Sequence, residues 1–133
     1  PSVSYHLRNG GSALIDRKDP KQAVAEINRH AELLFRNNWS TLIFPEGTRS
    51  KTGVPKKFKS RGVKILIEKI PNVLIVPITI NNSYKFNRWV NFPLPLGVRL
   101  KFDVHAPVEP SEDLSSEFFD QIEKTITDAI VLD

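Results

Sequence analysis

The chain has 133 residues and contains neither cysteine nor methionine. The lack of cysteine excludes disulfide bonds and thiolate chemistry and fits a reducing compartment. Without methionine the sequence has no initiator, so we expect either a processed start or a piece of a longer protein. Long apolar runs are also missing, since Val73–Ile78 is far shorter than the roughly 20 residues that span a bilayer. The first residues lack the basic and apolar regions of a signal peptide.

The composition predicts one domain covering residues 1–133. Hydrophobic residues make up 40% of the chain and charged residues 26%, enough for a core beneath a polar surface. The formal net charge of +4 favours an anionic partner, such as a phosphorylated molecule, an acidic membrane or a nucleic acid.

Apolar residues recur with helical spacing in some segments and with strand spacing in others. Asp19 followed by Pro20 is typical of a helix start, the first as N-cap and the second at the first helical position. This alternation predicts an α/β fold with a mixed, largely parallel sheet flanked by helices, incomplete at its N-terminus. The expected helices are 21–37, 60–69 and 115–132, and the expected strands are 13–15, 41–44, 73–80 and 98–104.

The segment Phe44–Ser50 carries the residues best suited to chemistry. Pro45 lacks a donor for a sheet ladder and tends to end a strand, and Gly47 permits a tight turn. Glu46, Thr48 and Arg49 are therefore expected at a strand end, where open α/β sheets bind ligands. The Arg49 guanidinium suits phosphate or carboxylate. The alternative is a solvated loop with an internal Glu46–Arg49 ion pair.

Several familiar site motifs are absent from the sequence. The glycines match neither a phosphate-binding loop nor a dinucleotide fingerprint nor a serine-hydrolase elbow. The three histidines, at positions 6, 30 and 105, have no metal-ligand spacing, so no metal site is expected.

Four segments together resemble the 1-acyl-glycerol-3-phosphate acyltransferase family, in order and in approximate spacing. The likeness covers nearly the whole chain and implies a glycerol-3-phosphate acyltransferase-like fold. It also implies a role in phospholipid biosynthesis, as an acyltransferase that moves a fatty acyl group from a thioester to a lysophospholipid. The segments are Gly11–Arg17, Phe44–Ser50, Phe58–Gly62 and Val76–Ile80.

The resemblance implies roles for six residues. Arg17 and Arg49 would converge on the acceptor's phosphate, Glu46–Thr48 would shape the glycerol-phosphate pocket, and Pro77 would border the acyl donor. Each position also has a structural interpretation. Arg17 could pair with a neighbouring aspartate, and Pro77 could be a simple kink in an edge strand.

The chain departs from the family at the catalytic His-x-x-x-x-Asp motif. The residue five positions after each histidine is Gly11, Phe35 or Pro110. The chain therefore has no catalytic residue of its own, and we expect the motif ahead of Pro1. In the family that histidine acts as general base, worth about 10²–10⁴-fold in rate. The alternative is a non-catalytic phosphate- or lipid-binding module derived from this fold.

The partners implied are a lysophospholipid, acyl-CoA or acyl-carrier protein as co-substrate, and an anionic membrane surface, with no further cofactor. The implied location is peripheral, on the cytoplasmic side of a membrane. A nucleic acid is not expected, because the basic residues have little aromatic interleaving. One basic cluster could bind anionic groups or could simply be a solvated face. It comprises Lys51, Lys56, Lys57, Lys59, Arg61 and Lys64.

Overall fold

The structure, a computed structural model, describes residues 12–13, 15–16, 18–48, 50–87 and 96–132. Arg17 and Arg49 lie outside the described residues. The chain divides into two compact units. Unit 1 is Pro1–Pro45 with Ser60–Val73, and unit 2 is Glu46–Lys59 with Leu74–Asp133. No helix in the described ranges is both long enough and apolar enough to cross a bilayer.

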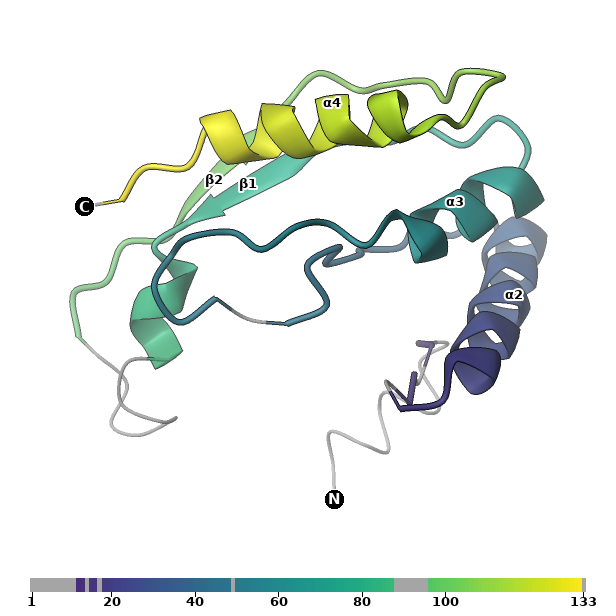
Figure 1. Cartoon of the computed structure of the whole chain (residues 1–133), viewed down its shortest axis with the longest axis horizontal. Helices are drawn as coiled ribbons and strands as arrows, with labels where there is room; N and C mark the ends of the chain where they lie inside the picture. The colour runs from purple at the N-terminus through teal and green to yellow at the C-terminus, as the bar shows by residue number, and fades with distance from the viewer. Residues whose placement is uncertain (1–11, 14, 17, 49, 88–95, 133) are drawn as a thin grey trace. The chain divides into compact units, whose positions relative to one another are not determined.

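Unit 1 contains two helices, α2 (Pro20–Asn37) and α3 (Ser60–Lys69) (Figure 1). The Asp19 side chain accepts hydrogen bonds from the backbone N–H groups of Lys21 and Gln22, which confirms it as the N-cap. At the other end Asn38 adopts the left-handed conformation that commonly stops a helix. Both helices lie where the sequence places them, and in α2 the ends are set by local chemistry.

The core of unit 1 is apolar. Ala31 and Leu34 of α2 form a buried cluster with Leu66 of α3, and Ile27 and Ile70 pack against it. These side chains recur at helical spacing, so one face of each helix is apolar and the two faces pack together.

The expected strand at Thr41–Phe44 is wrong. These residues form no strand, and the side chains of Leu42 and Phe44 are 65% and 64% exposed. A short apolar run is compatible with a strand but does not require one, since a strand needs a partner for its backbone groups. Thr41 instead contacts α2, since its Oγ1 lies 3.0 Å from Nε2 of His30 in that helix.

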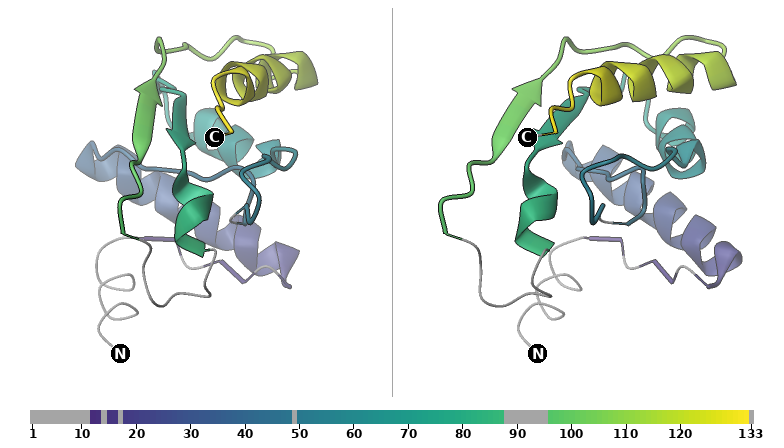
Figure 2. Two further views of the ribbon diagram at one scale, coloured as in Figure 1. Left: turned by 90° about the vertical axis from the view of Figure 1, so that its left-hand side faces the viewer. Right: turned by 60° about the vertical axis from the view of Figure 1, so that its left-hand side comes forward.

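Unit 2 contains the described sheet, two antiparallel strands named β1 (Ile78–Asn81) and β2 (Lys101–Val104). Ile78 pairs with Val104 and Asn81 with Lys101. The 3-10 helix η1 (Ser83–Asn87) follows β1, and helix α4 (Ser116–Asp128) lies beside the strands (Figure 2). Because this pairing is antiparallel, the described residues do not confirm a largely parallel sheet.

The expected strand at 73–80 is shorter in the structure. Ile75 makes an isolated bridge with Val108, and regular pairing begins only at Ile78. Pro77 lies between Ile75 and Ile78. Because proline has no backbone N–H, it cannot donate a hydrogen bond to the neighbouring strand there. Its carbonyl still accepts a hydrogen bond from His105 N–H at 3.0 Å. The proline therefore sets the start of β1.

Candidate functional site

The turn at residues 46–48 is the described part of the candidate site. Gly47 has a φ of +66°, a left-handed conformation that strains any residue with a Cβ. The sequence predicted this glycine turn, and the geometry confirms it. The turn carries Glu46, which is half-buried, and Thr48, which is exposed.

Glu46 closes the loop that follows the turn. Its Oε2 accepts a hydrogen bond of 3.0 Å from the backbone N–H of Lys56, ten positions along the chain. The side chain thus binds a backbone amide and holds the two ends of residues 46–56 together. The role in the glycerol-phosphate pocket that the resemblance implies for Glu46 stays a prediction.

A second turn, at residues 50–54, is built on the Ser50 hydroxyl. The Ser50 Oγ accepts from the Gly53 N–H at 2.9 Å and donates to the Val54 carbonyl at 2.9 Å. A Cβ on Gly53 would lie 2.6 Å from Leu132 and 2.8 Å from the ring of Tyr84, closer than real atoms approach. Only glycine fits there, so the loop packs tightly within unit 2.

The far end of the loop is tied to α4. The backbone N–H of Phe58 donates to the Glu123 Oε1 at 3.4 Å. Together with the Glu46 and Gly53 contacts, this bond holds residues 46–59 at three places. An irregular segment fixed in this way can hold side chains in a defined arrangement.

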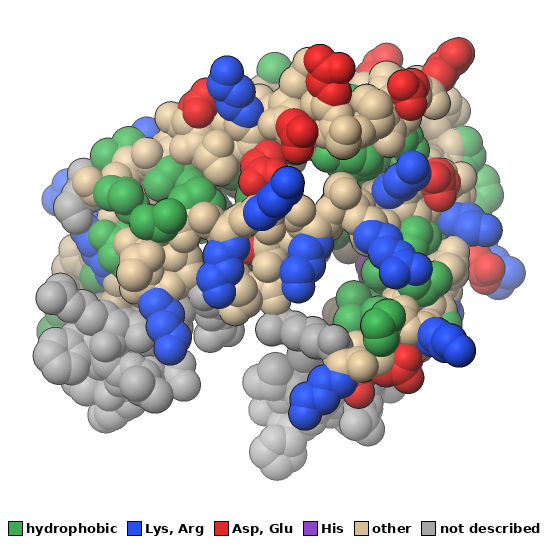
Figure 3. All heavy atoms as spheres, in the orientation of Figure 1, with side chains coloured by type: hydrophobic (Ala, Val, Ile, Leu, Met, Phe, Trp, Pro, Cys, Tyr) green, Lys and Arg blue, Asp and Glu red, His purple; other side chains and the backbone are tan. Residues whose placement is uncertain are grey.

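The loop presents a row of lysines to solvent. Figure 3 shows Lys and Arg side chains exposed over this irregular segment. The exposed lysines of the loop are Lys51, Lys56, Lys57 and Lys59. Exposure is compatible with either interpretation of the basic cluster, anion binding or a solvated face.

Pro77, expected beside the acyl donor, is buried at the start of β1 in the same unit as the 46–48 turn. Of the six predicted site residues, the structure thus places Glu46, Gly47, Thr48 and Pro77 in unit 2. Arg17 and Arg49 fall outside the described residues, so the expected convergence of their guanidiniums stays a prediction. Of the aspartates near Arg17, Asp19 caps α2 and Asp16 accepts from the Lys18 N–H at 2.9 Å.

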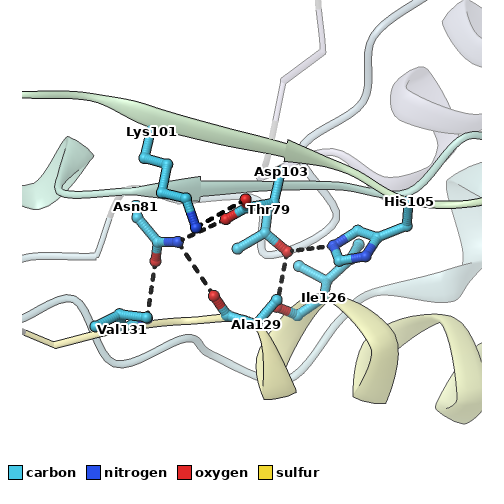
Figure 4. A network of polar contacts seen from close by, with 8 residues as sticks. All are labelled: Thr79, Asn81, Lys101, Asp103, His105, Ile126, Ala129 and Val131. Atoms are coloured by element: carbon cyan, nitrogen blue, oxygen red, sulfur yellow. Dashed lines mark hydrogen bonds and ion pairs between the residues drawn. The ribbon is translucent and has the colours of Figure 1, made fainter.

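Sequence reasoning missed a polar network on one face of the sheet (Figure 4). The Thr79 Oγ1 donates to the Ile126 carbonyl at 2.9 Å and lies 2.8 Å from the His105 Nε2. Since the single hydroxyl proton goes to the carbonyl, the ring nitrogen must be the donor to Thr79. Thr79 is fully buried, so its hydroxyl is not accessible to a substrate.

Asn81 forms the other half of this network. Its Nδ2 donates to the Ala129 carbonyl and to the Asp103 Oδ2, each at 3.1 Å, and its Oδ1 accepts from the Val131 N–H at 2.9 Å. Asp103 also pairs with Lys101 at 2.9 Å. The last carbonyls of a helix lack intrahelical hydrogen-bond donors. For α4, side chains of β1 supply these donors. The network is structural.

Two further features bear on ligands. Among the described residues no three side chains of the metal-binding types gather as a metal site would require. Unit 2 has a hollow of about 100 Å³, too small for a fatty acyl chain. It is lined by Val108, Phe118, Gln121, Ile122 and Thr125.

Comparison with known proteins points to one kind of enzyme. Residues 1–81 match the model of the family described as Acyltransferase. A 1-acyl-sn-glycerol-3-phosphate acyltransferase of Helicobacter pylori is 40% identical over 88 residues, covering 62% of this chain and 37% of that protein. The enzyme of the same name from Limnanthes douglasii is 26% identical over 133 residues, covering 98% of this chain and 43% of that one.

A solved structure is similar in fold. The crystal structure of the 1-acyl-sn-glycerophosphate acyltransferase PlsC from Thermotoga maritima matches with a TM-score of 0.68 and 24% identity. The match covers 96% of this chain and 49% of that one. The chain therefore spans half or less of the length of these relatives.

Proposed function

Because the chain belongs to the acyltransferase family, we propose that it carries the acceptor-binding part of a phospholipid-synthesising acyltransferase. The acceptor is a lysophospholipid such as 1-acyl-glycerol-3-phosphate, in keeping with the names of the relatives. The observation that carries the proposal is the built turn at Glu46–Thr48, followed directly by Arg49, within a segment that matches the family.

In this proposal Arg17 and Arg49 hold the acceptor's phosphate. A phosphate monoester is close to a dianion at neutral pH, and planar guanidiniums bind its oxygens in pairs of charge-assisted hydrogen bonds. Glu46 keeps the loop closed by accepting a hydrogen bond from the Lys56 backbone. Gly47 and Thr48, in the turn that this bond holds, line the glycerol-phosphate pocket. Pro77 borders the acyl donor by fixing where β1 begins.

The reaction is the attack of the acceptor hydroxyl on the carbonyl carbon of an acyl thioester. A carbon–oxygen bond forms, the carbon–sulfur bond breaks, and the thiol leaves with the proton that a general base takes from the hydroxyl. None of the three histidines has an aspartate five positions later, so this chain supplies no such base. We expect the chain alone to be inactive, with the base provided from outside this sequence.

The donor in this proposal is acyl-CoA or acyl-carrier protein, and no other cofactor takes part. The enzyme works peripherally on the cytoplasmic side of a membrane, at an anionic surface. The exposed lysines of the 46–59 loop support that location, since each basic residue near such a surface contributes about 1 kcal/mol.

The lack of a His-x-x-x-x-Asp motif favours one second candidate, a non-catalytic module that binds phosphate or lipid. A thioester-release assay with lysophosphatidic acid separates the two once the residues encoded ahead of Pro1 are included. Turnover that depends on a histidine there supports the enzyme. Turnover by the present chain alone, abolished by Glu46→Gln or Arg49→Ala, contradicts its expected inactivity.

Acceptor binding is tested by calorimetric titration with short-chain lysophosphatidic acid below its micelle concentration. We expect Arg49→Ala and Arg17→Ala each to weaken binding at least about ten-fold, the cost of one charged hydrogen bond. Arg36→Ala, at an exposed position in the last turn of α2, is the matched control. Equal affinity for the wild type and the Arg49 variant overturns the proposed acceptor site.

A further inference from the structure

The side chain of Lys59 lies over the glycine of the candidate turn. A Cβ at Gly47 would be 3.6 Å from the Lys59 Nζ, 3.7 Å from its Cδ and 3.8 Å from its Cε. These are ordinary van der Waals distances. The lysine stem therefore packs against the 46–48 turn, with its ammonium group beside Gly47.

The loop brings these two residues together, although they are twelve positions apart in the chain. The Glu46–Lys56 hydrogen bond closes the loop just before Lys59, and the Phe58–Glu123 bond fixes the preceding residue. Lys59 differs in this from a lysine in an untethered loop, because the two bonds hold the backbone just ahead of it.

The ammonium charge has no partner in the part of the chain that the structure describes. The ion pairs of the described residues are Arg29–Glu26 and Lys101–Asp103. Lys59 takes part in neither of them and makes no hydrogen bond to another described residue. The acid of the turn itself, Glu46, accepts a hydrogen bond from a backbone amide. An exposed cation held beside a turn is positioned to meet an anion.

We propose that Lys59 binds the phosphate monoester of the acceptor beside the Gly47 turn. This inference rests on the function proposed above. A phosphate monoester is close to a dianion at neutral pH, and an ammonium group is a compact charge that donates charge-assisted hydrogen bonds to its oxygens.

The test is calorimetric titration with sn-glycerol 3-phosphate, which carries the phosphate monoester without a lipid tail. Lys59→Met keeps the stem that packs on Gly47 and removes the charge. We expect it to weaken binding about ten-fold or more, the cost of a hydrogen bond to a charged group. Lys59→Arg keeps the charge and should bind within a few-fold of the wild type. Lys57→Met, at another exposed lysine of the same loop, should change binding less than two-fold.

Coenzyme A also carries a phosphate monoester, so a parallel titration with it distinguishes the acceptor from the donor. Loss of coenzyme A binding alone in Lys59→Met overturns the proposal. Equal effects of Lys59→Met and Lys57→Met also overturn it, since the lysines would then act only as a diffuse field. If Arg49→Ala weakens glycerol 3-phosphate binding and Lys59→Met does not, the Lys59 proposal fails and the proposed function survives. If neither variant changes binding, both fail.

Circular dichroism and thermal unfolding check that Lys59→Met is folded. A folded variant with weakened binding that Lys59→Arg restores supports the role of charge. If the folded Lys59→Met and Lys59→Arg variants weaken binding equally, the role of charge is overturned, because binding would then depend on the shape of the side chain.

Discussion

In unit 1, α2 and α3 contact each other through apolar side chains, whereas in unit 2 the contacts between α4 and the sheet include hydrogen bonds from Thr79 and Asn81. These two polar side chains are 0% and 3% exposed, as deeply buried as Leu34 in unit 1. The opposite face of the same strands is apolar, yet Phe102 and Val104 are 57% and 67% exposed. The two polar residues of β1 thus occupy its protected face.

The cause is the end of α4. The last carbonyls of a helix have no intrahelical donors, and burying them unpaired costs about 1–3 kcal/mol each. Thr79 and Asn81 supply donors to Ile126 and Ala129, so the polar face must turn toward the helix. Apolar packing tolerates substitutions that keep volume, whereas a hydrogen-bonded contact requires particular atoms. The two units should therefore respond differently to substitution.

Leu34→Ala should give the largest loss of stability. Leu34 lies at the centre of the apolar cluster with Ala31 and Leu66, so truncation leaves a cavity costing about 2–5 kcal/mol. Denaturant unfolding measures the loss, and hydrogen exchange should locate it in α2 and α3. Leu42→Ala, at an exposed position, should stay within about 0.5 kcal/mol. Similar losses in both variants would contradict the assignment of the core.

Asn81→Leu should follow, with a loss of roughly 2–4 kcal/mol, because three part-buried hydrogen bonds of a buried side chain are lost at once. The residues left unpaired are Ala129 and Val131, and hydrogen exchange should increase at the end of α4. Asn37→Ala is the control, since the Asn37 amide donates to the Leu33 carbonyl from an exposed position. If the two asparagine variants lose equal stability, the buried network does not hold α4.

Helices were predictable from this sequence because their determinants are local. Asp19, Pro20 and Asn38 define α2, and the observed α3 has the bounds that its apolar spacing predicts. Helix α4 begins at Ser116, one residue after the predicted start, and ends at Asp128, four residues before Leu132. The backbone of Ala129 and Val131 pairs with Asn81, a residue about 50 positions away, which no local pattern encodes.

The sheet was harder to predict. Alternation in 98–104 indicated a strand, of which only Lys101–Val104 forms one, and it implied that the apolar residues face the core. The structure has Phe102 exposed and Thr79 buried, the reverse arrangement, because α4 needs donors from that face. Of the candidate site, the Gly47 turn could be predicted from residue type, since only glycine adopts its conformation freely. The Lys59 contact could not, because it depends on how the loop closes.

Thr79→Val should cost less than the asparagine variant, about 1–3 kcal/mol, because it preserves shape and removes only one hydroxyl. The Ile126 carbonyl and the His105 ring would each lose a partner. Thr79→Ser restores the hydroxyl and should recover part of the loss in denaturant unfolding. Equal stability of the valine and serine variants would show that the methyl group, and not the hydrogen bonds, matters at this position.

Arg29→Gln should have the smallest effect, because its ion pair lies at the surface, in contrast to the buried network of unit 2. The 2.8 Å hydrogen bond from Arg29 lowers the pKa of Glu26 below its ordinary value. A carboxyl whose pKa is lower in the folded state stabilises the fold above its unfolded pKa, near 4.3, and loses that contribution as the pH falls through the lowered value. The variant should therefore be slightly less stable than the wild type at pH 7, and the two should converge at lower pH. Salt should also remove the difference, since it screens exposed charges.

An NMR titration of the Glu26 carboxyl checks the cause directly, because its pKa must rise in Arg29→Gln. A difference between the two proteins that persists below the lowered pKa would have to come from the helix itself and not from the charge.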